Sequence, residues 1–177
     1  VPHGAEPPPP RAWADRGIPF LLVGNLRQSS GQLRAAWVTR GSEIPILEAM
    51  ADMLSDPGAL PLEELCQRAI AATGNSDGPL AAPRAIAKML RYFDPYARAV
   101  VREGMLKALS GLPLTVVGDW SGLEANISDV ARFTGPLDSK TVQDMAERAQ
   151  CIVDTTPAYY SSHERIFEGL AGGSLVA

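Results

Sequence analysis

The stretch that decides the fold is residues 18–25, Ile-Pro-Phe-Leu-Leu-Val-Gly-Asn, a short apolar run that ends in a glycine and an asparagine. An apolar run of this length followed by turn residues is typical of a buried strand and the tight turn after it. Residues 18–23 therefore predict the first strand of an α/β domain.

The same pattern returns in the C-terminal part of the chain. Strands are predicted at 114–117, ending in Gly118, and at 130–133, ending before Gly135. A helix over 139–149, a short strand at 152–153 and a last strand at 175–177 follow. Because strands and helices alternate in this way, the fold class is α/β with a Rossmann-like parallel sheet.

The segment from about residue 31 to 110 has helical periodicity instead. Leu47, Met50 and Leu54 are three and four residues apart, and Asp56-Pro57-Gly58 stops that helix. Further helices are predicted over 61–72 and 83–93. Asp94 and Pro95 resemble an N-cap followed by a first-turn proline, so a separate helix is expected from there to near Gly111. The fold prediction is thus a sheet with a large helical insertion between its first and second strands.

Composition limits the function classes. The 177 residues carry a net charge of -4 and their basic residues are scattered, which argues against nucleic acid as a partner. Cys66 and Cys151 lack the spacing of a metal or redox site, and two reduced thiols fit a cytoplasmic protein. No apolar run is long enough for a membrane span. With only His3 and His163, no metal site is expected.

The ends of the chain predict a fragment or an excised domain. Residues 1–17 include four consecutive prolines and predict an extended linker, leaving 18–177 as the domain. The chain begins with Val1 and stops in a strand-like run, so a fragment is expected.

Ligands of parallel α/β sheets bind beyond the carboxyl ends of the strands. Five residues at predicted strand ends, together with the loop 154–163, are therefore expected on one rim: Gly24, Asn25, Gly118, Asp119 and Gly135. The alternative for Gly24 and Asn25 is an ordinary turn, and for Asp119 and Trp120 a turn with a core-packing tryptophan.

The loop 154–163 leads into a predicted helix whose start has the spacing of a capping box, Ser161 and Glu164. The backbone amides of a helix start, with Arg165 beside them, favour an anion such as a phosphate. Capping explains Glu164. Glu168 has no such structural duty, although a solvated helix carboxylate is the alternative.

Three segments in this order resemble a known family: residues 113–120, residues 132–136, and residues 162–173, Ser-His-Glu-Arg-Ile-Phe-Glu-Gly-Leu-Ala-Gly-Gly. They resemble the C-terminal, nucleotide-sugar-binding domain of glycosyltransferases with two Rossmann domains (the GT-B fold), in the spore-maturation-protein-like branch. The match covers residues 113–177, about a third of the chain, and extends weakly to residues 2–5 and 20–25.

The resemblance implies a role for Glu168, which holds the position that binds the ribose hydroxyls of the nucleotide. The donor diphosphate is expected at loop amides and at five residues: Gly24, Asn25, Ser162, His163 and Arg165. Secondary contacts to donor or base are expected from Asp119, Trp120, Thr134, Gly135, Tyr159 and Tyr160. The two tyrosines could equally pack. Tyr160 stands where the family usually has a second glutamate, which leaves the donor-sugar contact and the stereochemistry open.

Other motifs are absent from the sequence: the phosphate-binding loop of nucleoside triphosphatases, the G-x-G-x-x-G fingerprint and the G-x-S-x-G nucleophile elbow. The hypothesis is therefore a donor-binding glycosyltransferase domain that takes a nucleotide-diphosphate sugar as substrate and has no permanent cofactor. A missing N-terminal domain would bind the acceptor, whether protein, glycan or small molecule. A non-catalytic interaction module, or an epimerase or phosphorylase of the same fold, are the alternatives.

Overall fold

The computed structural model describes residues 12–54, 60–123, 131–155 and 173–177. These residues divide into two compact units. The sheet unit contains the described residues up to Arg27, those from Arg102 to Thr155, and 173–177. The helical unit contains the described residues between Gln28 and Val101.

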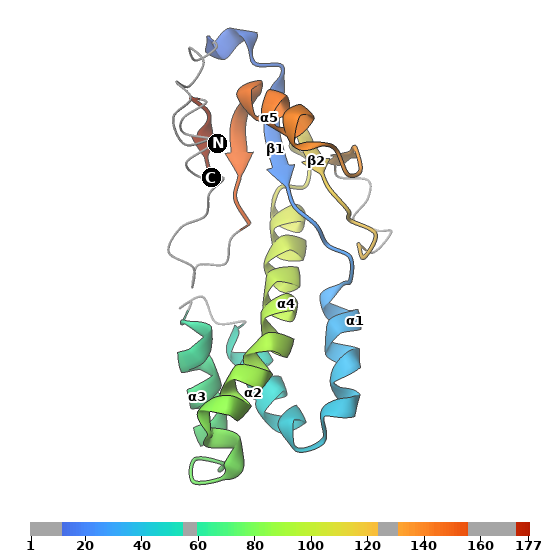
Figure 1. Ribbon diagram of the computed structural model, residues 1–177. Coiled ribbons are helices and arrows are strands. Elements are labelled where there is room, and N and C mark those ends of the chain that lie inside the picture. The colour runs from blue at the N-terminus through green and yellow to red at the C-terminus, as the bar shows by residue number, and fades with distance from the viewer. Residues whose placement is uncertain (1–11, 55–59, 124–130, 156–172) are drawn as a thin grey trace. The chain divides into compact units, whose positions relative to one another are not determined.

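The sheet unit is built on five strands (Figure 1): β1 (Ile18–Val23), β2 (Leu114–Val117), β3 (Ala131–Phe133), β4 (Ala149–Val153) and β5 (Leu175–Val176). Their order is β3-β2-β1-β4-β5, and each neighbouring pair is parallel. In the centre, Phe20 lies opposite Leu114 of β2 and Cys151 of β4. The predicted α/β class with a parallel sheet is confirmed.

Apolar side chains of the strands explain how one face of the sheet is covered. Leu21 on β1 forms a buried cluster with Val117, Ala149 and Ile152, and helix α5 (Ser139–Glu147) packs Val142 and Met145 against it. Helix α5 begins at Asp138, whose side chain accepts a hydrogen bond from the backbone of Thr141. Burial of these side chains fixes the helix on the sheet.

The boundary after α5 differs from the sequence prediction. The helix was expected to run to residue 149, but it ends at Glu147, and Ala149 is already the first residue of β4. Ala149 pairs with Ile18 of β1 and is fully buried. Alanine has the highest helix propensity of all residues, but propensity is a weak preference, and the pairing of Ala149 with β1 overrides it.

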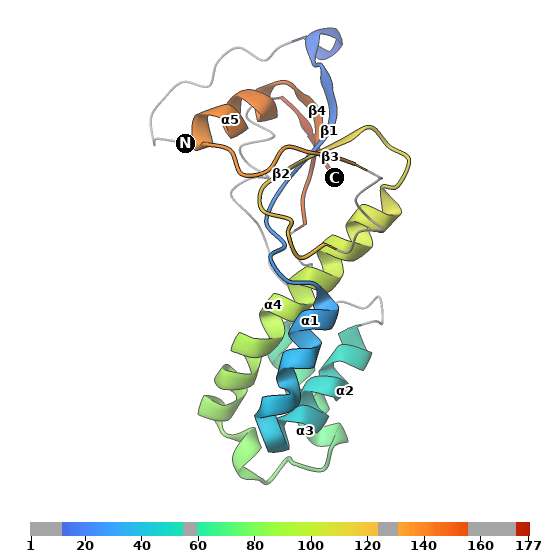
Figure 2. The same ribbon diagram turned by 90° about the vertical axis from the view of Figure 1, so that its right-hand side faces the viewer.

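The chain between β1 and β2 is helical (Figure 2). It comprises α1 (Ser30–Ala35), the 3-10 helix η2 (Ala36–Glu43), α2 (Ile44–Leu54), α3 (Leu62–Ala72), η3 (Pro79–Ala81) and α4 (Pro83–Ala108). A further 3-10 helix, η1 (Trp13–Asp15), precedes β1. Helix α1 starts with a capping box between Ser29 and Gln32. The helices predicted near Leu47 and over 61–72 are confirmed.

Helix α4 corrects the prediction of two separate helices. It runs through Asp94 and Pro95 without a break. The Asp94 carboxylate does not cap a helix start, because Arg98 donates to it over one turn at 2.8 Å. Residues on both sides of the proline, Phe93, Tyr96 and Ala97, are buried in the same core. This burial outweighs the backbone hydrogen bond that Pro95 cannot make.

The core of the helical unit is centred on three aromatic rings. Trp37 lies 4.9 Å from Tyr96 and 6.0 Å from Phe93 between ring centroids, and Phe93 lies 5.4 Å from Tyr96. Leu47 and Met89 belong to the same core as the three rings and are fully buried. Tilted and offset rings at these distances are a favourable packing of aromatic side chains.

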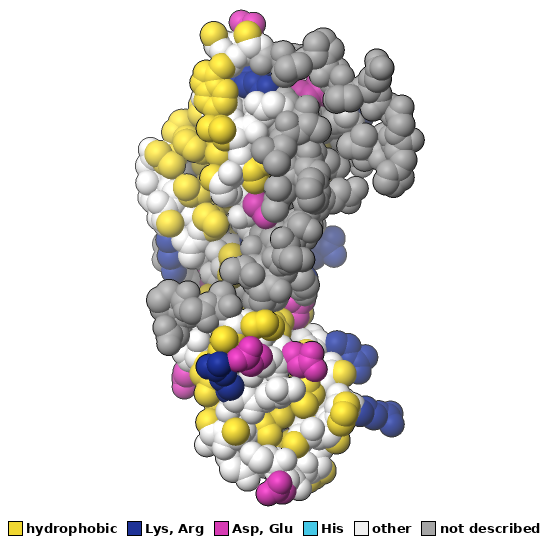
Figure 3. Space-filling model, turned by 90° about the vertical axis from the view of Figure 1, so that its left-hand side faces the viewer, with side chains coloured by type: hydrophobic (Ala, Val, Ile, Leu, Met, Phe, Trp, Pro, Cys, Tyr) yellow, Lys and Arg dark blue, Asp and Glu magenta, His cyan; other side chains and the backbone are white. Residues whose placement is uncertain are grey.

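Both cysteines are free, buried thiols, one in each unit: Cys66 on α3 and Cys151 on β4. None of the described helices is long and apolar enough to cross a membrane. On the face of the molecule drawn in Figure 3, described Lys and Arg side chains are spread among acidic, hydrophobic and uncharged ones. The charge pattern on this face is therefore mixed.

Candidate functional site

The strand order defines a reversal point in the sheet. From β1 the chain adds β2 and then β3 on one side, and it returns to add β4 on the other side of β1. The carboxyl ends of β1 and β4 therefore flank the place where the order reverses. In open parallel sheets this is where ligands bind, because the loops that follow the two strands diverge.

Two glycines bring the backbones of the first two loops together at this edge. The Gly24 amide donates to the carbonyl of Val117 at 2.9 Å, and the Gly118 amide donates to the carbonyl of Gly135 at 3.0 Å. Gly118 has a φ of 123°, and a Cβ there would lie 1.7 Å from the Gly24 carbonyl oxygen. Only a residue without a side chain fits, so glycine is a requirement at position 118.

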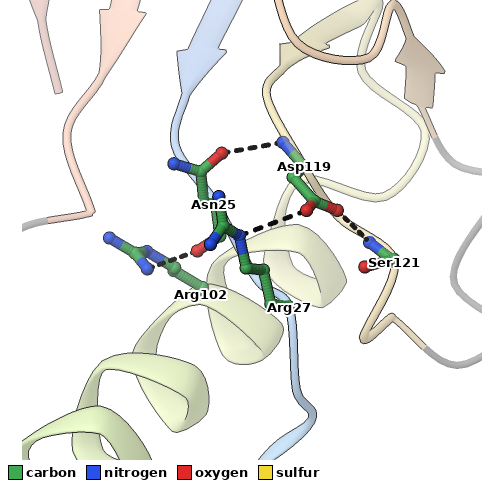
Figure 4. Close-up of polar contacts among 5 residues, drawn as sticks. All are labelled: Asn25, Arg27, Arg102, Asp119 and Ser121. Atoms are coloured by element: carbon green, nitrogen blue, oxygen red, sulfur yellow. Dashed lines mark hydrogen bonds and ion pairs between the residues drawn. The ribbon is translucent and has the colours of Figure 1, made fainter.

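Polar side chains then join the loops after β1 and β2 (Figure 4). The Asn25 Oδ1 atom accepts from the Asp119 amide at 2.7 Å. The Leu26 amide donates to the Asp119 carbonyl at 2.7 Å, and the amide of Gly122 donates back to the carbonyl of Leu26 at 2.8 Å. These bonds make the two loops one continuous backbone surface.

The Asp119 carboxylate is held on both oxygens. Its Oδ1 accepts from the Ser121 amide at 3.1 Å, and its Oδ2 lies 3.2 Å from Arg27 Nε. Hydrogen bonds from Ser121, and the positive charge of Arg27 to a smaller extent, hold the pKa of Asp119 below its ordinary value. At neutral pH the group is a carboxylate with a structural role in its own loop.

Arg102 reaches this edge from the last turns of α4. Its Nη1 donates to the Asn25 carbonyl at 2.5 Å, and its Nε lies 3.4 Å from the hydroxyl of Thr155. Asn25 follows β1 and Thr155 follows β4, so one guanidinium contacts the loops on both sides of the reversal point. Gly24 is also adjacent, since a Cβ on it would lie 3.8 Å from Arg102 Nε.

Two secondary candidates serve packing and backbone pairing. Trp120 is buried, its ring centroid lies 6.4 Å from that of Phe133, and its Nε1 donates to the Val117 carbonyl at 3.4 Å. The Thr134 amide and hydroxyl both point at the carbonyl of Val116, at 3.0 and 3.4 Å. For Trp120 this geometry favours the core-packing alternative.

The structure thus brings together five of the candidate residues: Gly24, Asn25, Gly118, Asp119 and Gly135. Six others lie outside the described residues: Tyr159, Tyr160, Ser162, His163, Arg165 and Glu168. The capping pair Ser161 and Glu164 lies outside them as well.

Three residues of this edge were not predicted from the sequence, Arg27, Arg102 and Ser121, whereas Thr155 lies in the loop 154–163 that was expected on the rim. Arg27 could have been found, because it follows Asn25 by two residues in the same predicted turn. Arg102 gives no local signal, since 77 residues separate it from the carbonyl that it contacts. Only the tertiary structure places it at this edge.

Comparisons with known proteins add no relative: no family model, no curated protein and no solved structure matches this chain. Within the described segments, no group of three or more His, Cys, Asp or Glu side chains could hold a metal ion. We therefore infer the function from the contacts at the carboxyl edge of the sheet and from the family resemblance in the sequence.

Proposed function

We propose that this chain is the donor-binding half of a glycosyltransferase that moves a sugar from a nucleotide diphosphate to an acceptor. The observation that carries the proposal is the meeting of Gly24, Asn25, Gly118 and Asp119 at the carboxyl edge of the sheet, where Gly24 and Asn25 follow β1, one of the two strands that flank the reversal point. Ligands of parallel α/β sheets bind beyond this edge. The resemblance of residues 113–177 to nucleotide-sugar-binding domains supports the same ligand.

In the proposed mechanism, catalysis is mainly electrostatic. Negative charge grows on the diphosphate as the sugar leaves, and the amides of residues 162–165, with the side chains of His163 and Arg165, stabilise it. Preorganised donors of this kind are typically worth about 3 kcal/mol each. Glu168 holds the ribose hydroxyls and takes no part in proton transfer. The acceptor, and a base if the reaction inverts the sugar, belong to a second domain.

In this reading the helical segment after β1 is an insertion into the nucleotide-binding domain. Its helices α1 to α4 occupy the connection that joins β1 to β2, and their core consists of their own side chains. Two reduced, buried cysteines are consistent with action in the cytoplasm. The insertion has no assigned part in the transfer step.

Isothermal titration calorimetry of the chain with UDP, GDP, dTDP and CMP tests the proposal. We expect one of these nucleotides to bind with a Kd at or below the millimolar range. Binding should be lost in Glu168→Ala and retained in Glu164→Ala, because the second glutamate is expected only to cap the helix. The pair is matched in residue type and in predicted helix.

If none of the four nucleotides binds, even at concentrations well above the millimolar range, the donor-binding function is wrong. A protein-interaction module then becomes the better hypothesis. Equal loss of binding in both glutamate variants would contradict the role of Glu168. Product analysis with a bound nucleotide sugar separates transfer from epimerisation or phosphorolysis, which would need the same anion site.

A further inference from the structure

Arg102 occupies a position that neither the motifs nor the family resemblance assign. It lies near the end of α4, outside the loops that were expected to bind the donor. Its guanidinium contacts the carbonyl of Asn25 after β1 and the hydroxyl of Thr155 after β4. These two loops flank the reversal point of the strand order, where a ligand of a parallel sheet binds.

Three features fix the guanidinium in this place. The helix carries its backbone, hydrogen bonds to Asn25 and Thr155 hold Nη1 and Nε, and the side chain is only partly exposed. Arginine keeps its positive charge at any ordinary pH, and its planar fork matches phosphate oxygens. A charge held rigidly before the ligand arrives costs little further ordering on binding.

We infer that Arg102 is the residue that selects a phosphate-bearing ligand at this edge and positions the loops after β1 and β4 around it. The inference rests on the proposed function, because it names a phosphate-recognition residue of that same site.

A merely structural role is the alternative, in which Arg102 only joins two loops. The two roles separate by charge. A structural bond would affect charged and uncharged ligands alike, whereas phosphate recognition affects charged ligands and their salt dependence. Inorganic pyrophosphate isolates the charged part, since it has neither sugar nor base.

The test is a calorimetric titration of the full chain with pyrophosphate, with the nucleotide that binds best and with the uncharged nucleoside of that nucleotide. We expect Arg102→Gln to raise the Kd for pyrophosphate at least about tenfold, and Arg102→Lys to raise it less, because lysine keeps the charge without the fork. Arg91→Gln is the matched control, since Arg91 is an exposed arginine of the same helix and the charge change is identical. Its Kd should stay within about twofold of the wild type.

Folding of each variant is checked by circular dichroism and by the thermal unfolding temperature. If Arg102→Gln does not fold, Arg102→Lys carries the comparison, together with the dependence of Kd on salt in both folded proteins. Thr155→Val removes the hydroxyl contact but leaves the charge, and it should raise the Kd for pyrophosphate by less than about threefold.

The outcomes separate the two proposals. Arg102→Gln or Arg102→Lys that binds pyrophosphate and nucleotide as tightly as the wild type overturns the role of Arg102 and leaves the donor-binding function standing. Pyrophosphate binding that depends on Arg102, without any nucleotide binding, supports the inference and overturns the proposed function. A wild-type chain that binds neither ligand overturns both.

Discussion

At the carboxyl edge of the sheet the residues that meet are glycines and polar side chains, whereas the core of the helical unit consists of aromatic and aliphatic ones. The first region holds its geometry by backbone contact, as between Gly24 and Gly118. The second holds it by side-chain volume, as between Trp37 and Phe93. Substitutions that add atoms should therefore destabilise the edge of the sheet most, and substitutions that remove atoms should destabilise the helical core most.

The largest effect is expected from Gly118→Ala. The new Cβ would lie 1.7 Å from the Gly24 carbonyl oxygen, at a φ of 123° that side chains rarely adopt. Backbone strain and overpacking each cost about 1–3 kcal/mol, so we expect a loss of about 2–6 kcal/mol in the free energy of unfolding. Urea denaturation followed by circular dichroism measures it.

Gly104→Ala is the matched control, because Gly104 lies within α4 and a Cβ there meets nothing within 4 Å. It should stabilise the protein by about 0.5–1 kcal/mol, the helix preference of alanine over glycine. Equal, small effects of the two alanines would contradict the close approach of the loops.

A smaller loss is expected from Phe93→Leu in the helical core. Phe93 is fully buried between Trp37 and Tyr96, and leucine removes ring atoms and two aromatic contacts without adding any strain. Conservative core substitutions of this kind cost about 1–2 kcal/mol. The same denaturation experiment tests the ranking, and a loss larger than that of Gly118→Ala would reverse the comparison.

Cysteine reactivity sharpens the comparison further, because each unit contains one buried thiol. Burial raises the pKa of the Cys66 thiol to about 11 and raises that of Cys151 as well. At pH 8 both should therefore react with iodoacetamide far more slowly than a free thiol, since the thiolate is the nucleophile. Mass spectrometry after labelling locates the modified cysteine.

Cysteine labelling of the two variants shows which unit opens. Gly118→Ala should expose Cys151 to labelling more than Cys66, and Phe93→Leu should do the opposite. Denatured protein, in which both thiols react, is the reference. Rapid labelling of both cysteines in the folded wild type would contradict their burial.

The smallest effect concerns the pKa of Asp119. Its folded value lies below the ordinary 3.8, so the bonds to its carboxylate stabilise the folded state above that pH and are lost as the pH falls through the folded pKa. Ser121→Ala keeps the backbone hydrogen bond but removes the one from the Ser121 side chain, which is the largest cause of the shift, so it should raise this pKa more than Arg27→Gln does. Carboxyl resonances followed by NMR between about pH 2 and 6 give the order, and the reverse order would contradict it.

The sequence predicted the strands and the meeting of their loops for a physical reason. Apolar runs that end in glycine, as at Val23-Gly24 and Val117-Gly118, carry both the burial and the turn in one short segment. The position of the loops then follows from the topology of the sheet, because parallel strands place their carboxyl ends at one edge.

Two features escaped sequence reasoning because they depend on distant residues. Asp94-Pro95 has the local pattern of a helix start, yet Phe93 and Tyr96 bury their side chains in one core and keep α4 continuous. Arg102 likewise belongs to the edge only through contacts with Asn25 and Thr155, far away in sequence. Local pattern does not encode either arrangement.

We propose that a nucleotide diphosphate binds at the carboxyl edge of the sheet. The most direct measurement is a nitrogen-15 NMR titration with the nucleotide that binds best, following the backbone amides of Gly24, Asn25, Gly118 and Asp119. We expect these amides to show the largest changes in chemical shift, and the amides around Trp37 and Phe93 in the helical core to keep their chemical shifts. Saturating nucleotide that leaves the four edge amides unchanged, or that shifts only amides of the helical unit, would contradict it.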